Sequence, residues 1–123
     1  MVVTIEYQIL EDDIYEFLAV MAQRRRIRRR DGAHNWRLLR DLSDRSLWIE
    51  RYETATWLDY ARLNNRVTQD DAPIPERIRA LHQGVGEPRV RRMLERQTSA
   101  VPNGPRLGAS ELAEPLTDPN RTA

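Results

Sequence analysis

The chain has 123 residues, a formal net charge of +1 and no cysteine. This length suits one domain with its own core, and the near-neutral charge creates no field that would favour nucleic acid as a partner. Without cysteine, disulfides and thiolate chemistry are excluded. No stretch approaches ~20 apolar residues, and the N-terminus lacks a basic segment followed by an apolar run. We therefore expect a soluble cytoplasmic protein.

The first two elements predicted from the sequence are a strand and a helix. Residues 2–9 alternate between apolar and polar side chains, which predicts a strand with one apolar face. After the acidic residues 11–13, apolar residues recur at helical spacing and predict a long helix. These apolar residues are Ile14, Phe17, Leu18 and Met21.

The predicted helix ends in an arginine-rich segment, RRRIRRR at residues 24–30. Asp31-Gly32 follows, and glycine readily adopts the left-handed conformation that terminates a helix. The apolar stripe extrapolates to Arg25 and Arg28. We expect their aliphatic stems to cover the edge of the core with their charges in water. The alternative is that one of them lines a pocket.

The remaining elements alternate in the same way. Residues 33–41 and 47–52 show strand periodicity with a short turn between them, which predicts a hairpin. A helix should begin near residues 54–56, and Pro73 and Pro75 should start another short helix. Residues 89–95 form the last predicted strand.

When the two helices before the last strand are counted as one helical segment, the order is strand-helix-strand-strand-helix-strand, the βαββαβ pattern of α+β ferredoxin-like domains. It predicts a four-stranded antiparallel sheet with helices on one face. We assign Trp48, Tyr52 and Met93 to the opposite face, which would be too apolar to remain exposed. A homodimer formed through that sheet face would cover it.

The composition changes near residue 97. Proline, glycine, serine and threonine become frequent, and no apolar period persists. Such a segment cannot bury enough apolar surface to offset its ordering entropy. We therefore divide the chain into a ferredoxin-like domain, residues 1–96, and a disordered C-terminal tail, residues 97–123.

Several segments of residues 2–96 also resemble a known family. They read VVTIEYQI, RRIRRRDGAHNWRLLRDLSD, WIERYETATWLDYARLNNRVTQDD and ERIRALHQGVGEPRVRRML. Together they resemble the C-terminal cytoplasmic domain of major-facilitator exporters of the enterobactin-exporter and transmembrane secretion effector type. That domain is similar in turn to the antibiotic biosynthesis monooxygenases, which are dimeric α+β barrels. The resemblance implies a dimeric α/β barrel and a membrane exporter as partner.

The resemblance also implies a candidate activity, the cofactor-independent oxidation of an aromatic small molecule. In related monooxygenases the substrate lies between the sheet and the helices, beside asparagine, tryptophan, tyrosine and arginine side chains. The matching pocket candidates are Trp57, Tyr60, Asn64, Trp36 and Arg40. Trp57 would form a wall of the pocket, although an ordinary core position also explains a tryptophan there. The catalytic residues stay unassigned.

Haem, flavin and metal are not expected as cofactors. Haem-degrading relatives use a histidine on the second helix as axial ligand, and exporter-attached domains would carry histidine at positions 60 and 64. This chain has Tyr60 and Asn64 there. His34 and His82 lie at the start of a predicted strand and on a late helix, where each suits a polar surface or edge position better than a ligand position. No cluster of histidines and carboxylates predicts a metal site.

The alternative function is a non-catalytic ligand-binding or transporter-associated accessory domain. Glu50, on a strand rich in aromatic residues, suits either a ligand site or a structural ion pair. We expect the structural role, because a buried glutamate needs a cationic partner. The predicted partners are Arg37 and Arg91, on strands that flank Glu50 in the expected sheet.

Overall fold

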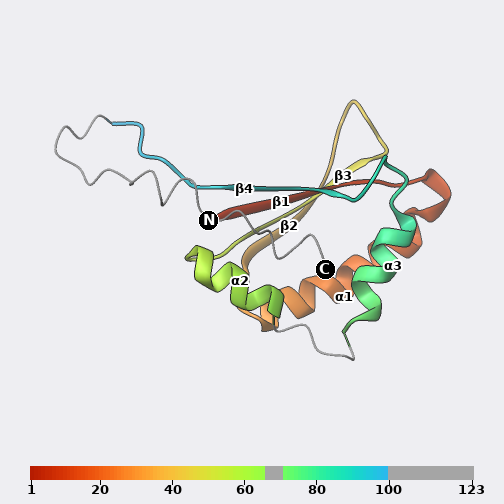
Figure 1. Ribbon diagram of the computed structural model, residues 1–123. Helices are drawn as coiled ribbons and strands as arrows, with labels where there is room; N and C mark the ends of the chain where they lie inside the picture. The colour runs from red at the N-terminus through yellow and green to blue at the C-terminus, as the bar shows by residue number, and fades with distance from the viewer. Residues whose placement is uncertain (66–70, 100–123) are drawn as a thin grey trace.

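The computed structural model describes residues 1–65 and 71–99. They form an α+β ferredoxin-like domain, as predicted, with a four-stranded antiparallel sheet in the order β2-β3-β1-β4. Figure 1 shows the three α-helices on the same side of this sheet. The elements are β1 (Val2–Gln8), the 3₁₀ turn η1 (Glu11–Asp13), α1 (Ile14–Arg30), β2 (His34–Arg40), β3 (Leu47–Glu53), α2 (Trp57–Asn65), α3 (Pro73–Leu81) and β4 (Arg89–Met93).

Two expectations from the sequence concern the C-terminal tail and membrane-spanning helices. Most of the predicted tail, residues 97–123, lies outside the described residues, so its disorder stays a prediction. Within residues 1–65 and 71–99, no helix has the length and hydropathy needed to cross a membrane.

The core lies between the helices and one face of the sheet. Val3, Ile5 and Tyr7 of β1 are buried there at alternate positions, as the periodicity predicted. Pairing with β3 places Tyr52 opposite Val3 and Trp48 opposite Tyr7. Because directly paired residues point to the same side of a sheet, both aromatic residues belong to the helix-covered face.

The assignment of Trp48 and Tyr52 to the other face is therefore wrong. Both are buried against the helices, with 7% and 0% of their surface exposed. The β3 sequence LWIERYE carries large apolar residues at both parities, so its alternation did not indicate which side faces inward. Met93 does lie on the opposite face, beside Val2, and is 45% exposed.

We call that opposite surface the open face of the sheet. It is more mixed in character than predicted, because charged side chains alternate with apolar ones across its strands. Its apolar members are Val2, Leu39, Leu47, Ile49 and Met93, and its charged members include Glu6, Arg37, Arg51, Glu53, Arg89 and Arg91.

The buried stripe of α1 differs slightly from the predicted one. It runs through Phe17, Val20, Met21, Arg24 and Arg28, whereas Leu18 is 39% exposed and Arg25 is exposed. Steps of three and four residues keep this set on one side of the helix. The stripe therefore carries two arginines into the core at the C-terminal half of α1.

The end of α1 follows the prediction. Gly32 has φ of 104°, in the left-handed region where glycine has no steric penalty. Its N–H donates to the Arg29 carbonyl over 3.2 Å, and the Ala33 N–H donates to the Arg28 carbonyl over 2.9 Å. This pair of bonds is the Schellman motif, and it turns the chain directly into β2.

Candidate functional site

A buried carboxylate, that of Glu50, lies at the centre of the helix-covered sheet face and has no exposed surface. Three hydrogen-bond donors and one further guanidinium surround it. The Tyr7 hydroxyl donates to Oε1 over 2.9 Å, and Arg24 Nε lies 3.2 Å from the same oxygen. Arg28 Nε donates to Oε2 over 3.1 Å, and Trp36 Nε1 donates to it over 2.9 Å. We call these five residues the Glu50 cluster.

The Glu50 cluster keeps its carboxylate ionised. Burial alone would raise the pKa of Glu50, but the charges of Arg28 and Arg24 and the hydrogen bonds from Trp36 and Arg28 lower that pKa to about 2. Burial and the neighbouring Glu50 charge raise the pKa of the Tyr7 hydroxyl, so it remains a donor. The cluster is therefore stable in a single protonation state around neutral pH.

The predicted ion pairs of Glu50 are wrong in their partners. Arg37 lies opposite Arg51, and Arg91 lies opposite Thr4, so both arginines are on the open face. The carboxylate binds Arg24 and Arg28 of α1 instead. The prediction considered only neighbouring strands, whereas the spacing of four residues between Arg24 and Arg28 was the available signal. For Arg25 and Arg28, the sequence left open whether one of them lines a pocket. Arg28 does so, and it is only 5% exposed.

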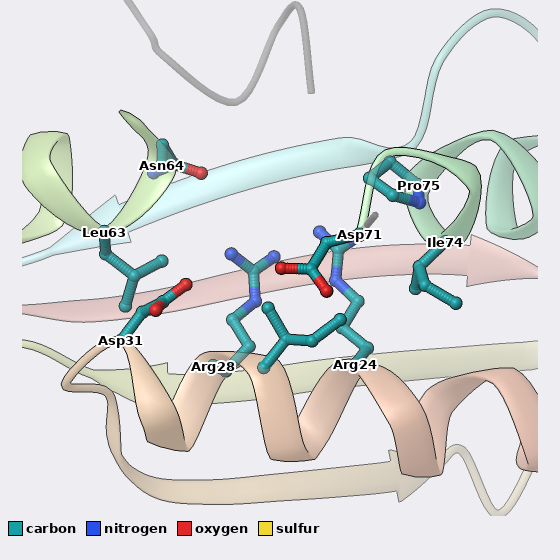
Figure 2. A pocket seen from close by; sticks show the side chains of 9 residues that line it. Arg24, Arg28, Asp31, Leu63, Asn64, Asp71, Ile74 and Pro75 are labelled. Carbon is teal, nitrogen blue, oxygen red and sulfur yellow. The ribbon is translucent and has the colours of Figure 1, made fainter. Parts of the chain in front are cut away.

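A small pocket adjoins the Glu50 cluster between α1 and the ends of α2 and α3. Figure 2 shows Arg24 and Arg28 extending from α1 toward it, below Asn64 and Pro75. Its volume is about 30 Å³, which is large enough to hold water but not a small organic molecule. The lining residues are Arg24, Ile27, Arg28, Asp31, Leu63, Asn64, Asp71, Ile74 and Pro75.

The charges around this pocket are matched. Arg30 binds Asp31 through two contacts of 2.9 and 3.1 Å, and it binds Asp71 over 2.8 Å. Together with the Glu50 cluster, three guanidinium groups therefore face three carboxylates. A second cavity, also about 30 Å³, lies on the other side of Arg24 between α3 and the sheet. The charged residues that line this second cavity are Arg24, Arg79 and Glu87.

The pocket candidates on α2 are near one another, but only Asn64 lines the pocket. Its Nδ2 donates to the Tyr60 carbonyl over 3.0 Å. Tyr60 is fully buried, and its ring packs against that of Trp57 at a centroid distance of 5.1 Å. Trp57 is half-buried at the start of α2, under the guanidinium of Arg92 at 5.6 Å.

The two candidates on β2 lie elsewhere. Trp36 belongs to the Glu50 cluster through its indole N–H. Arg40, at the other end of β2, stacks over the Trp48 ring at 4.9 Å and donates to the Arg45 carbonyl over 2.8 Å. The structure therefore brings Trp36 to the buried carboxylate, and it places Arg40 apart from both cavities.

No group of three or more residues able to hold a metal ion occurs within residues 1–65 and 71–99. His82 has a structural partner, because its Nδ1 accepts the backbone N–H of Gln8 over 3.0 Å. Burial lowers the pKa of His82, which favours the neutral ring that this bond requires.

Comparisons with known proteins bear on the family and the fold of this chain. A family model described as transmembrane secretion effector matches residues 1–100. A crystal structure of an antibiotic biosynthesis monooxygenase superposes with a TM-score of 0.61 at 14% identity, covering 77% of this chain and 100% of that one. A candidate antibiotic biosynthesis monooxygenase from Nitrosomonas europaea gives a TM-score of 0.61 at 13% identity, covering 76% and 88%. No match was found among curated proteins.

A third solved structure, a candidate antibiotic biosynthesis monooxygenase from Bordetella bronchiseptica, has a TM-score of 0.57 at 17% identity and covers 78% of this chain and 96% of that one. At these identities the likeness establishes the fold. The ferredoxin-like fold of the antibiotic-monooxygenase type, expected from the sequence, is thereby confirmed.

Proposed function

Since the chain belongs to the transmembrane secretion effector family, we propose that it acts as a non-catalytic accessory domain of a membrane exporter on the cytoplasmic side. One observation carries the non-catalytic part of this proposal. The Glu50 cluster occupies the space between sheet and helices, where an oxidase of this fold would need to hold its substrate.

The chemistry of Glu50 supports an accessory role over oxidation. Oxidation without a cofactor needs an oriented substrate in a dry pocket and a group that accepts a proton. Glu50 is a fully buried carboxylate beside that space, but its pKa of about 2 makes it a weak base near neutral pH. Its three hydrogen-bond donors and the Arg24 guanidinium also compete with a substrate for its oxygens.

The small volume of the cavities beside the Glu50 cluster also supports an accessory role over oxidation. Sites for small molecules commonly measure roughly 300–1,000 Å³, whereas the two cavities beside the Glu50 cluster measure about 30 Å³ each. An aromatic substrate would therefore require a displacement of α2 or α3 from the arrangement described.

Oxidation of an aromatic small molecule is the second candidate. Asn64 favours it, because its Oδ1 is buried beside the first pocket and has no hydrogen-bond partner among the described residues. An acceptor in that state could receive a phenolic hydroxyl if α2 moved outward. Trp57 and Tyr60 would then lie on the moving element.

The same proposal includes a homodimer formed through the open face. Leu39 and Met93 are each 45% exposed there, and Ile49 lies between Leu39 and Glu6 in the sheet. Two such faces packed together would exclude water from these side chains. The charged neighbours on both sheets would set the relative orientation of the two copies.

Oxygen uptake with anthrone-like and quinol substrates tests the non-catalytic claim. We expect no uptake above the rate of autoxidation. Uptake by the wild-type protein that falls in a folded Trp57→Ala variant would instead establish the oxidase.

Binding to an exporter tests the accessory role directly. The membrane portion of a secretion-effector exporter, lacking its own C-terminal domain, should retain this chain on a detergent column. A Glu50→Gln variant that remains folded should be retained equally well, since Glu50 is buried. Failure of the wild-type chain to bind, measured by surface plasmon resonance, would contradict the accessory role.

A further inference from the structure

The arginine-rich segment of α1 serves more than the Glu50 cluster. Two of its six arginines bind Glu50, and a third binds two aspartates. The other three are exposed on a different side of the helix, and none forms an ion pair with a carboxylate among residues 1–65 and 71–99. These three are Arg25, Arg26 and Arg29.

The three exposed arginines line a groove with apolar surface beside them. The groove lies between one side of α1 and the edge strand β2, and its volume is about 430 Å³. That volume is within the range of small-molecule sites, and it is far larger than the cavities beside Glu50. The lining residues are Leu18, Ala22, Arg25, Arg26, Arg29 and Trp36.

Trp36 supplies a fixed aromatic surface in this groove. Its indole N–H donates to Glu50 over 2.9 Å, which restrains the direction of the ring, and the residue remains half-buried. The Arg25 guanidinium lies over that ring at 5.8 Å, a longer distance than the 4.5 Å between Arg28 and Tyr52. Since Arg25 is exposed, it can move aside for a planar group that stacks on Trp36.

The positive charge of the groove favours a ligand that carries an anionic group beside its planar ring. Arg25 and Arg29 are four residues apart, so their like charges face each other on α1 and destabilise the helix slightly. A bound anion would remove this repulsion. Guanidinium groups bind carboxylates through paired hydrogen bonds, which makes a carboxylate a well-matched anion.

We propose that this groove is a binding site for an aromatic carboxylate, with the ring on Trp36 and the carboxylate held by Arg25 and Arg29. This site goes beyond the proposed function, because it names a ligand class and places it outside the space between sheet and helices. It does not depend on whether the chain oxidises anything or binds an exporter.

The test uses 1-naphthoate as the probe and the neutral 1-naphthamide as its matched control. The chain has three tryptophans, so an NMR spectrum of protein labelled with ¹⁵N-tryptophan contains three indole signals. We expect naphthoate to shift the Trp36 signal saturably, and naphthamide to bind at least about tenfold more weakly. Added salt should weaken naphthoate binding, because the arginines are exposed.

Two variants separate the groove from general charge effects. Arg25→Gln with Arg29→Gln should weaken naphthoate binding about tenfold or more, and both side chains are exposed, so the fold should persist. The control is Arg77→Gln on the exposed side of α3, which should leave the affinity unchanged. The proposal fails if naphthoate shifts only the Trp57 or Trp48 signal, if Arg77→Gln weakens binding equally, or if no saturable shift occurs.

These outcomes are distinguishable from those of the proposed function. Saturable binding at Trp36 together with oxygen uptake would overturn the non-catalytic role and retain the groove. Exporter binding without any effect of naphthoate on Trp36 would overturn the groove and retain the accessory role.

Discussion

Arg28 Nε lies 3.1 Å from Glu50 Oε2, and this contact joins the last turns of α1 to the middle of β3. Arg28 also stacks over the Tyr52 ring at 4.5 Å, so its guanidinium is held by a charge and an aromatic face together. A buried ion pair of this kind need not stabilise a fold more than apolar packing would. Its removal from one side, however, leaves the other charge buried without compensation.

Replacement of Glu50 by alanine should therefore strongly destabilise the domain. The change leaves the buried Arg24 and Arg28 without their carboxylate, and we expect a loss of roughly 3–5 kcal/mol in the free energy of unfolding. Urea denaturation measures this directly. The matched control is Glu53→Ala on the open face of the same strand, where the ion pair to Arg51 spans 3.8 Å and the loss should stay below about 1 kcal/mol. Equal losses in the two variants would contradict a special role for Glu50.

Stability should also depend on acid pH through Glu50. Its pKa is lowered from 4.5 to about 2 in the folded protein, so the unfolded chain binds the proton more readily. The resulting stabilisation is present above pH 4.5 and is lost as the pH falls from there toward 2. A series of urea melts should show this decline, and Glu50→Gln should flatten it. An equally steep decline in the variant would assign the effect to other carboxylates.

His82 should add a separate pH dependence nearer neutrality. Burial lowers its pKa below the usual 6.5, and its Nδ1 accepts the Gln8 N–H. The stabilisation is therefore present above about pH 6.5 and declines as the pH falls through the lowered pKa. Thermal melts between pH 7.5 and about pH 5 should record it, and His82→Phe should remove that part of the change. A proton NMR titration of His82 that gives a raised pKa would contradict the assignment.

Gly84 should not tolerate a side chain, because it lies against the His82 ring. A Cβ added there would lie 2.6 Å from both Cε1 and Nε2 of His82. Gly84→Ala must therefore shift the His82 ring, which accepts the Gln8 N–H of β1. We expect a weaker Gln8–His82 hydrogen bond and a lower melting temperature. Gly86→Ala is the informative comparison, because a Cβ at Gly86 meets no atom within 4 Å although its φ of 75° adds backbone strain. The exchange rate of the Gln8 amide should rise in the first variant alone.

The proposed homodimer should depend on the open face. We expect a dimer at micromolar concentration, and Ile49→Glu should shift it toward monomer by placing a charge at the centre of the contact. Leu58→Glu is the control, because Leu58 is 55% exposed on α2, away from the sheet. Light scattering coupled to gel filtration gives the mass. A wild-type protein that is monomeric across that range would exclude this assembly.

Local chemistry determined much of this structure. The alternation at residues 2–9 and 47–52 and the apolar spacing after Ile14 each predict their element from a few neighbouring residues. Gly32 likewise ends α1 where the left-handed conformation is needed. Because these signals act within one or two turns of chain, they could be recognised without knowledge of the partners. The order of elements then led to the ferredoxin-like sheet.

The partners across the core were decided only by the tertiary structure. β3 has apolar residues on both sides, so its register with β1 was needed to place Trp48, Glu50 and Tyr52 under the helices. The angular position of α1 then brought Arg24, and not Arg25, to the buried carboxylate. A shift of one residue in β3 would exchange its inner and outer faces, and a shift of one residue in α1 would rotate its buried stripe by about 100°. A single sequence carries no local signal that distinguishes these arrangements. The positions of Arg37 and Arg91 on the open face follow from the same register.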